Sequence, residues 1–318
     1  MNRKQWINVL KVVVSIVLLA IIFSTIDVRA LLFTLQNAHP TWLAAALVMM
    51  ILGVVIRAFR WQILLTAIGV PVPLGELTAI YFIGFLFNNL LPSGLGGDAM
   101  RMVELNKHSP RVSDTVTSVV VDRFLGLFAL QAIALVALLT NWGAVPNGVA
   151  YFTIVIFMGG LIGGLLLINR PLYTNLRQKI GLFRRLTDIK FISSTFESFH
   201  RYPLPALGQS FLVSIIFNFV HITMYAFIGF SLDAPVNLAQ YAVIVPITSL
   251  LLLVPISFAG LGVREEAFRQ LYGQIGVAPE VAVAFSLLVH IIGNICTGLI
   301  GGVIYLLRGA QNVVSEEQ

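Results

Sequence analysis

Six apolar runs, each roughly the length that an α-helix needs to cross a lipid bilayer, constrain the fold of this 318-residue chain more than any other feature. Charged residues make up 11% of the chain, against about 25% in a typical soluble domain. The sequence therefore predicts an all-α membrane protein, a polytopic helical bundle with six full spans. These spans cover residues 7–26, 42–65, 116–140, 150–168, 204–231 and 280–307.

Two shorter apolar runs, 76–91 and 238–254, each end in a stretch that contains proline and glycine. Proline removes a backbone donor and glycine favours non-helical angles. Irregular backbone at membrane depth is tolerated where it is buried in protein or lines a cavity. We therefore expect both runs to form re-entrant hairpins that turn back without crossing the bilayer.

The distribution of basic residues favours this topology. If the N-terminus is cytoplasmic and both hairpins turn back, 17 of the 20 Lys and Arg residues fall on the cytoplasmic side, and the exceptions are Arg29, Arg264 and Arg269. This asymmetry is what the positive-inside rule requires. We expect a multi-pass protein of the cell membrane with both termini in the cytoplasm.

The two halves of this topology match each other in order but begin on opposite sides of the membrane. Within one domain, 1–318, repeat 1 covers about 1–145 and repeat 2 about 150–310. The segments LLPSGLGGD (90–98) and ISFAGLGVR (256–264) share Gly-Leu-Gly at the two hairpin tips. The sequence thus predicts an inverted-topology repeat, which in transporters places the binding site near the bilayer midplane.

Charged residues lie at both predicted tips. Asp98 is placed to cap the returning helix and Arg101 lies in its first turn, where free N–H groups and an arginine can hold a phosphate. At the second tip, Arg264 and Glu265 follow Gly262. We expect Asp98 to face Arg264 and Arg101 to face Glu265, with an anionic headgroup competing for the arginines. The alternative is that these charges cap helices, pair locally or lie in an aqueous vestibule.

Other polar residues lie within the predicted spans. Arg57 and Arg60 fall near the cytoplasmic end of the second span, where snorkelling explains them, with Trp61 as an interfacial aromatic; a lipid-phosphate contact is the alternative. Asp122 and Arg123 lie about two turns into the third span, so Arg123 is a candidate to contact a hairpin.

Three further polar residues, His221, His290 and Asn294, lie deeper in spans. Hydrogen bonds to neighbouring helices account for most such residues, and a proton relay through either histidine is the alternative.

The sequence lacks the motifs of several functional classes. The stretch GLGGDA (94–99) formally matches a dinucleotide fingerprint, but the strand that this fingerprint requires is missing. Neither G-x-S-x-G, H-E-x-x-H nor a Cys/His cluster occurs, so we predict no catalytic residue, metal or cofactor. The net charge of +6 reflects membrane topology and does not indicate nucleic-acid binding.

The segment 169–203, within repeat 2, is the one long polar stretch. Its mixture of Leu, Ile and Phe with Arg and Lys suits a helix on the anionic inner leaflet, and an ordinary basic cytoplasmic linker is the alternative.

Four motifs in this order, VIRAFRW, NNLLPSGLGGDAMR, VVVDRFLGL and FAGLGVREE, resemble the lysylphosphatidylglycerol synthase transmembrane region, the flippase-like domain found in uncharacterised integral membrane proteins. The resemblance covers nearly the whole chain. It implies a helical domain that moves a lipid between leaflets. The positions that match the motifs are Gly94, Gly96, Gly97, Asp98 and Arg101 in the first tip and Gly260, Gly262, Arg264 and Glu265 in the second.

The bifunctional synthase of that family carries a soluble catalytic domain after its membrane region, whereas this chain ends at Gln318. We therefore do not expect aminoacyl transfer. The expected function is translocation of an anionic or polyprenyl-linked lipid, with Arg101, Arg264 and Arg123 attracting phosphate. An accessory or intramembrane enzyme of lipid or glycolipid modification and a non-transporting scaffold remain as alternatives. A separate lipid-synthesising enzyme and a second copy of the chain are the possible protein partners.

Overall fold

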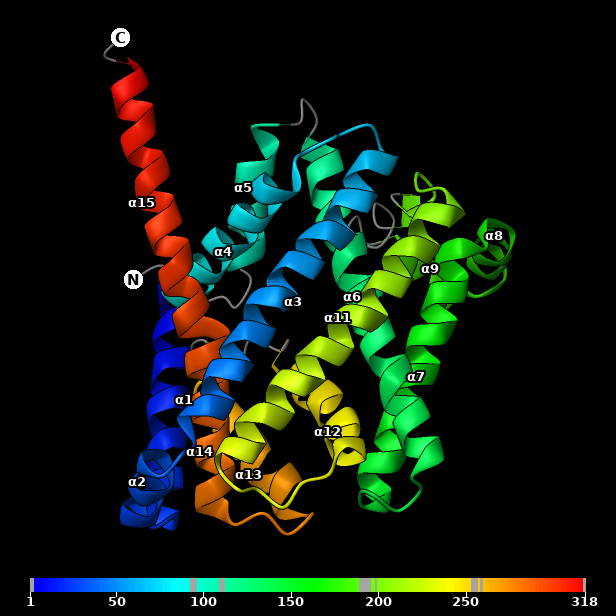
Figure 1. The fold of residues 1–318 in the computed structure, drawn as a ribbon. Helices are drawn as coiled ribbons and strands as arrows, with labels where there is room; N and C mark the ends of the chain where they lie inside the picture. Colours follow the sequence, from blue (N-terminus) through cyan, green and yellow to red (C-terminus); the bar gives the residue numbers. More distant parts are fainter. Residues whose placement is uncertain are drawn as a thin grey trace.

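The computed structural model describes residues 3–91, 96–108, 112–188, 196–197, 199–252, 257 and 260–316. Every regular element in these ranges is helical, which confirms the predicted all-α membrane class (Figure 1). The helices are α1 (Arg3–Thr25), α2 (Val28–Gln36), α3 (Pro40–Ala67), α4 (Leu74–Leu90), α5 (Gly96–Asn106), α6 (Val112–Thr140), α7 (Asn147–Ile168), α8 (Arg170–Lys179), α9 (Gly181–Thr187), α11 (Leu204–Ser231), α12 (Leu238–Leu251), α13 (Val263–Gly273), α14 (Pro279–His290), the π-helix η2 (Ile291–Cys296) and α15 (Thr297–Glu316).

Five helical stretches of the described chain are long and apolar enough to cross a membrane: α3, α6, α7, α11 and the continuous α14–η2–α15. α1 meets this criterion only together with α2, and the two are bent by 92°. A new helix begins at this bend because the Asp27 carboxylate accepts hydrogen bonds from the backbone N–H groups of Arg29 and Ala30 and so caps α2. The spans are thus five, or six if the bent pair crosses as one, and the predicted number of six stays a prediction.

α3 and α11 form the centre of the bundle and run side by side in opposite chain directions (Figure 1). The backbone N–H of His39, before α3, donates to Ser231 O at the end of α11 (2.9 Å). Further along, the ring of Phe217 lies 3.4 Å from the space that a Cβ on Gly53 would occupy. The two helices therefore pack closely along their length.

The first predicted hairpin is formed by α4 and α5. Near the tip, the backbone N–H of Gly97 donates to Asn88 Oδ1 (2.7 Å), and one turn further Gly84 faces Arg101. The chain therefore folds back on itself in an antiparallel pair. α4 is apolar but shorter than the helices that meet the spanning criterion, which agrees with a hairpin.

The second hairpin is formed by α12 and α13, and it repeats this geometry. The rings of Tyr241 and Tyr272 lie 6.2 Å apart, and Gly260 faces Leu252 near the tip. Asn237 and Gln240 form a capping box that starts α12. In Figure 1 the first hairpin lies in the upper part of the view and the second in the lower part, so the two approach the middle of the bundle from opposite ends.

Each hairpin packs against the last long helix of the other half: α4 against α15, and α12 against α6. Arg308 on α15 holds Glu76 on α4 through two hydrogen bonds of 2.7 Å. This reciprocal packing is what an inverted repeat with boundaries near 1–145 and 150–310 would produce. The repeat itself stays a prediction.

The predicted basic linker 169–203 begins with two short helices, α8 and α9. Arg177 pairs with Asp188 at 2.7 Å on their exposed side, and Tyr173 stacks on Phe196. Its contact with the inner leaflet stays a prediction.

Candidate functional site

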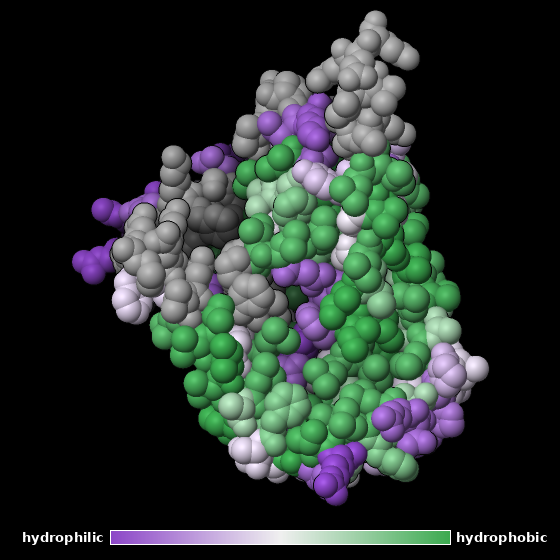
Figure 2. Space-filling model, turned by 90° about the vertical axis from the view of Figure 1, so that its left-hand side faces the viewer, coloured by the Kyte–Doolittle hydropathy of each residue, from purple (hydrophilic) through white to green (hydrophobic). Residues whose placement is uncertain are grey.

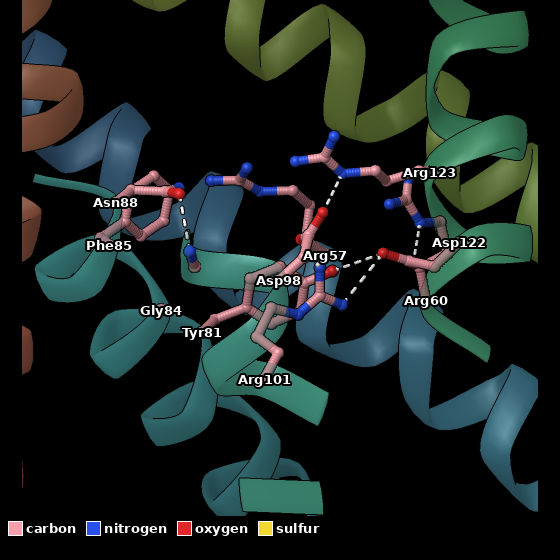
Figure 3. Close-up of a pocket in the computed structure, with 11 residues that line it drawn as sticks. Arg57, Arg60, Tyr81, Gly84, Phe85, Asn88, Asp98, Arg101, Asp122 and Arg123 are labelled. Atoms are coloured by element: carbon pink, nitrogen blue, oxygen red, sulfur yellow. Dashed lines mark hydrogen bonds and ion pairs between the residues drawn. The ribbon is translucent and has the colours of Figure 1, made fainter. Parts of the chain in front are cut away.

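The tip of the first hairpin borders a pocket of about 130 Å³ between α3, α4, α5 and α6 (Figure 3). Its lining is unusually charged for an apolar chain. The lining residues are Arg57, Arg60, Tyr81, Gly84, Phe85, Asn88, Gly97, Asp98, Arg101, Asp122 and Arg123. They include four arginines and two aspartates.

Helical spacing and one glycine bring these side chains together. Arg57 and Arg60 are three residues apart on α3 and therefore share a face, as do Asp98 and Arg101 on α5. α5 lies tightly on α4 because Gly97 has no side chain. A Cβ there would lie 2.5 Å from the carbonyl oxygen of Gly84 and 2.6 Å from Asn88 Nδ2.

Asp122 on α6 is the centre of the charged network. Its Oδ1 accepts from Arg60 Nε at 2.7 Å, and its Oδ2 accepts from Arg101 Nη2 at 3.1 Å and from Tyr81 Oη at 2.7 Å. The Asp122 side chain is 1% exposed. Arg60 also donates to Ser214 Oγ on α11 at 3.1 Å, so the network joins five helices of the bundle: α3, α4, α5, α6 and α11.

Asp98 holds the opposite side of the pocket. It pairs with Arg101 at 3.3 Å and with Arg123 on α6. The guanidinium of Arg101 also lies over two aromatic rings, 4.2 Å from the centre of Trp61 and 3.8 Å from the centre of Tyr81. Arg101 is thus fixed by two carboxylates and two rings.

Arg57 differs from the other three arginines. Among the residues that the structure describes, no carboxylate pairs with it, and no dashed line reaches it in Figure 3. Its guanidinium lies 4.9–5.5 Å from the ring centres of Tyr81, Phe85 and Phe217. Its Nε is buried without a hydrogen-bond partner. The pocket therefore has a cation with aromatic contacts and no paired anion.

The second tip forms a separate and charge-balanced cluster. Arg264 donates to Glu265 Oε1 at 2.9 Å and to Ser286 Oγ at 3.2 Å, and it lies 2.8 Å from His290 Nδ1. The backbone N–H of Gly262 donates to Glu265 Oε2 at 2.6 Å. Arg264 and Glu265 are 3% and 0% exposed, so this pair serves the packing of α13 on α14.

Further along α13, outside the spanning helices, hydrogen bonds from Arg269 lower the pKa of Glu266.

A chain of hydrogen bonds links the two hairpins. Asn89 at the end of α4 donates to the backbone oxygen of Asn294 at 2.7 Å, and Asn294 Nδ2 lies 3.3 Å from His290 Nδ1. Asn294 lies in the π-helical turn η2. The π-turn between α14 and α15 lies at the point where the first hairpin docks, and such turns are frequent at functional sites.

The structure separates the predicted site residues into two groups. Arg101, Arg123 and Asp98 meet in the pocket, with Gly97 lining it and Gly96 buried beside the tip. Gly94 lies outside the described residues. Arg264 and Glu265 lie in the second cluster with Gly260 and Gly262, whose φ angles of 77° and 83° favour glycine.

The predicted ion pairs between the tips, Asp98 with Arg264 and Arg101 with Glu265, are wrong. Each carboxylate pairs within its own half of the chain.

Sequence reasoning missed part of the pocket. Arg60 was expected to snorkel to the interface, but its side chain is 4% exposed and pairs with Asp122. Trp61, expected at the interface, is fully buried and donates to Ser118 Oγ at 3.1 Å. The sequence signal was the depth of Asp122 in its span, because a carboxylate there needs a cation.

Comparison with known proteins places these residues in a wider group. A family model described as the lysylphosphatidylglycerol synthase TM region matches residues 8–301. UPF0104 membrane protein PH1989 of Pyrococcus horikoshii is 22% identical, over 93% of this chain and 96% of that protein. Glycosyltransferase AglD of Haloferax volcanii is 24% identical, over 91% of this chain and 52% of that protein. The chain thus spans about half the length of the second relative.

Proposed function

This chain belongs to the lysylphosphatidylglycerol synthase TM region family, and on that premise we propose that it moves an anionic or polyprenyl-linked lipid between the leaflets of the cell membrane. The observation that carries the proposal is the pocket at the first hairpin, where four arginines meet two aspartates. Guanidinium groups match the geometry of phosphate oxygens. Uncompensated positive charge in an apolar protein is costly and typically marks a binding site or a path for ions or substrates.

The surface around the pocket suits a lipid. Figure 2 shows polar side chains recessed between hydrophobic helices on one face of the molecule. An apolar groove of about 300 Å³ lies between α6, α7 and α11, and Phe124 and Phe128 belong to its wall. Phe124 follows Arg123 directly in the chain. Because adjacent residues point to different faces of a helix, a headgroup held at Arg123 would leave its tails in the bilayer.

One specific observation favours a second function. The relative with the longer chain is named a glycosyltransferase, and this chain matches about half of it. In the second function, the pocket holds a lipid-linked substrate for a separate enzyme without moving that lipid. The two functions share the binding step and differ in leaflet movement.

A reconstitution experiment separates them. Purified wild type, Arg101→Gln and the control Arg269→Gln are placed in proteoliposomes with fluorescent anionic and zwitterionic lipids that carry the same tails. Arg269 is a suitable control because it pairs locally with Glu266, outside the pocket. We expect the wild type to move the anionic lipid selectively. Arg101→Gln should move that lipid roughly tenfold more slowly, which corresponds to a rise of about 1.4 kcal/mol in the activation free energy. Arg269→Gln should behave as wild type.

Each protein is first shown to be folded by its elution profile and melting curve. Folded wild type that moves none of the lipids would overturn the transport proposal. If that protein still binds the anionic lipid, the second function is favoured.

A further inference from the structure

The pocket contains more positively charged side chains than negatively charged ones. Four arginines and two aspartates line it, which leaves a formal charge of +2. Both aspartates are already shared: Asp122 binds Arg60 and Arg101, and Asp98 binds Arg101 and Arg123. Within the described lining, therefore, no carboxylate remains for Arg57.

The surroundings of Arg57 stabilise a cation without neutralising it. Rings of Tyr81, Phe85 and Phe217 surround its guanidinium, and the faces of such rings attract a cation. They supply no negative charge. Taking charges out of water costs several kcal/mol per ion. A ligand that carries two negative charges would neutralise the pocket, whereas a singly charged ligand would leave one positive charge uncompensated.

We propose that the pocket selects lipids whose phosphate or diphosphate headgroup carries two negative charges, and that Arg57 sets this preference. This inference rests on the proposed lipid function only in that a lipid headgroup reaches the pocket. A terminal phosphate monoester and a diphosphate diester both carry this charge. A phosphodiester headgroup with one negative charge, as in phosphatidylglycerol, is the disfavoured class.

Three lipids with the same two oleoyl tails test the charge requirement. Phosphatidic acid presents a phosphate monoester, phosphatidylmethanol a phosphodiester with one charge, and CDP-diacylglycerol a diphosphate diester. Binding to the purified full chain is measured by native mass spectrometry at about pH 8, above the second phosphate pKa of about 6. We expect phosphatidic acid to bind the wild type at least about tenfold more tightly than phosphatidylmethanol, a difference of 1.4 kcal/mol.

CDP-diacylglycerol distinguishes the two doubly charged sources. If it binds as tightly as phosphatidic acid, the pocket recognises the charge on either group. If it binds only as weakly as phosphatidylmethanol, the monoester is the recognised form. The first result supports a requirement for two negative charges in the headgroup, and the second narrows that requirement to two charges on one phosphate group.

Arg57→Gln isolates the role of the unpaired arginine. The substitution leaves every described ion pair of the pocket intact and lowers its formal charge to +1, so the protein should fold at least as well as wild type. We expect the roughly tenfold preference to fall to about one or below, because one negative charge now neutralises the pocket. Arg57→Lys should restore most of the preference, and the control Arg269→Gln should leave it unchanged.

Two results would overturn the inference and are distinguishable from failure of the proposed function. Equal binding of phosphatidic acid and phosphatidylmethanol to the wild type, or an unchanged preference in Arg57→Gln, would remove the charge requirement while leaving a lipid site in place. Folded protein that binds none of the three lipids would remove both the charge requirement and the lipid site.

Discussion

At the residue scale, three side chains of the pocket depend on the carboxylate of Asp122. Arg60, Arg101 and Tyr81 all donate to it from three different helices. Removing one partner of a buried ion pair leaves the other charge uncompensated, which typically costs about 3–5 kcal/mol. Asp122 therefore contributes to the structure of the bundle as well as to the electrostatics of the pocket.

We expect Asp122→Asn to destabilise the protein by about 3–5 kcal/mol, measured as a loss of thermal stability in detergent. Asp188→Asn is the matched control, because it removes the carboxylate of an exposed pair with Arg177, and exposed pairs contribute little to stability. Equal melting temperatures for the two variants would contradict the central role assigned to Asp122.

The site residues could be predicted only in part. Glycines, Asp98 and Arg101 at the tip follow from their position after a broken apolar run. Their partners do not follow, because which helix lies opposite a side chain depends on the packing of the bundle. Asp98 binds Arg123 on α6, although its counterpart by sequence position was Arg264. Arg60 was assigned to the interface because its packing against α6 and α11 is not encoded in the local pattern.

At the element scale, the hairpins depend on small residues where backbones meet. Gly301 on α15 faces the carbonyl oxygen of Phe82 on α4, and a Cβ there would overlap that backbone atom. Since backbone does not rotate away as a side chain does, the helices would have to separate. The contact between α4 and α15 therefore requires glycine.

We expect Gly301→Ala to lower stability by about 1–3 kcal/mol, the usual cost of overpacking, and to weaken lipid binding at the pocket because α4 supplies part of its wall. Gly159→Ala on α7 is the control, since nothing lies within 4 Å of its added Cβ. Thermal unfolding and the lipid titration are compared for both. Unchanged stability of Gly301→Ala would show that the two helices are not held at this distance.

Most helix positions were predictable, since apolar length alone defines them. The run 42–65 became α3, Pro40–Ala67, and 204–231 became α11 with the same bounds. The bend between α1 and α2 and the π-turn η2 were not predicted. The bend is a break at which Asp27 caps a new helix. The π-turn lies within a continuous helix, where Asn294 offers its backbone oxygen to Asn89 on α4. The hydropathy of a segment does not indicate where its backbone or side chains form such hydrogen bonds.

At the scale of the whole molecule, the predicted membrane topology can be tested by labelling residues near the hairpins and in the loops between spans. In a background with Cys296→Ser, single cysteines are placed at Asn106, Arg177, Asp233 and Gln274. We expect a membrane-impermeant maleimide added to intact cells to label the last two and not the first two. Labelling of Asn106 from outside would mean that the first hairpin crosses the membrane.

The ion pair between Glu76 and Arg308 joins residues 232 positions apart. At a synthesis rate of roughly 5–20 residues per second, the ribosome needs about 10–50 s to make the chain between them. During that interval the helix that packs against α4 of the first hairpin does not yet exist. Folding of the first hairpin therefore has a waiting period, and a chain released early would leave Glu76 on α4 without the arginine that pairs with it. The order of synthesis thus places a demand on the last helix, separate from any role of the pocket.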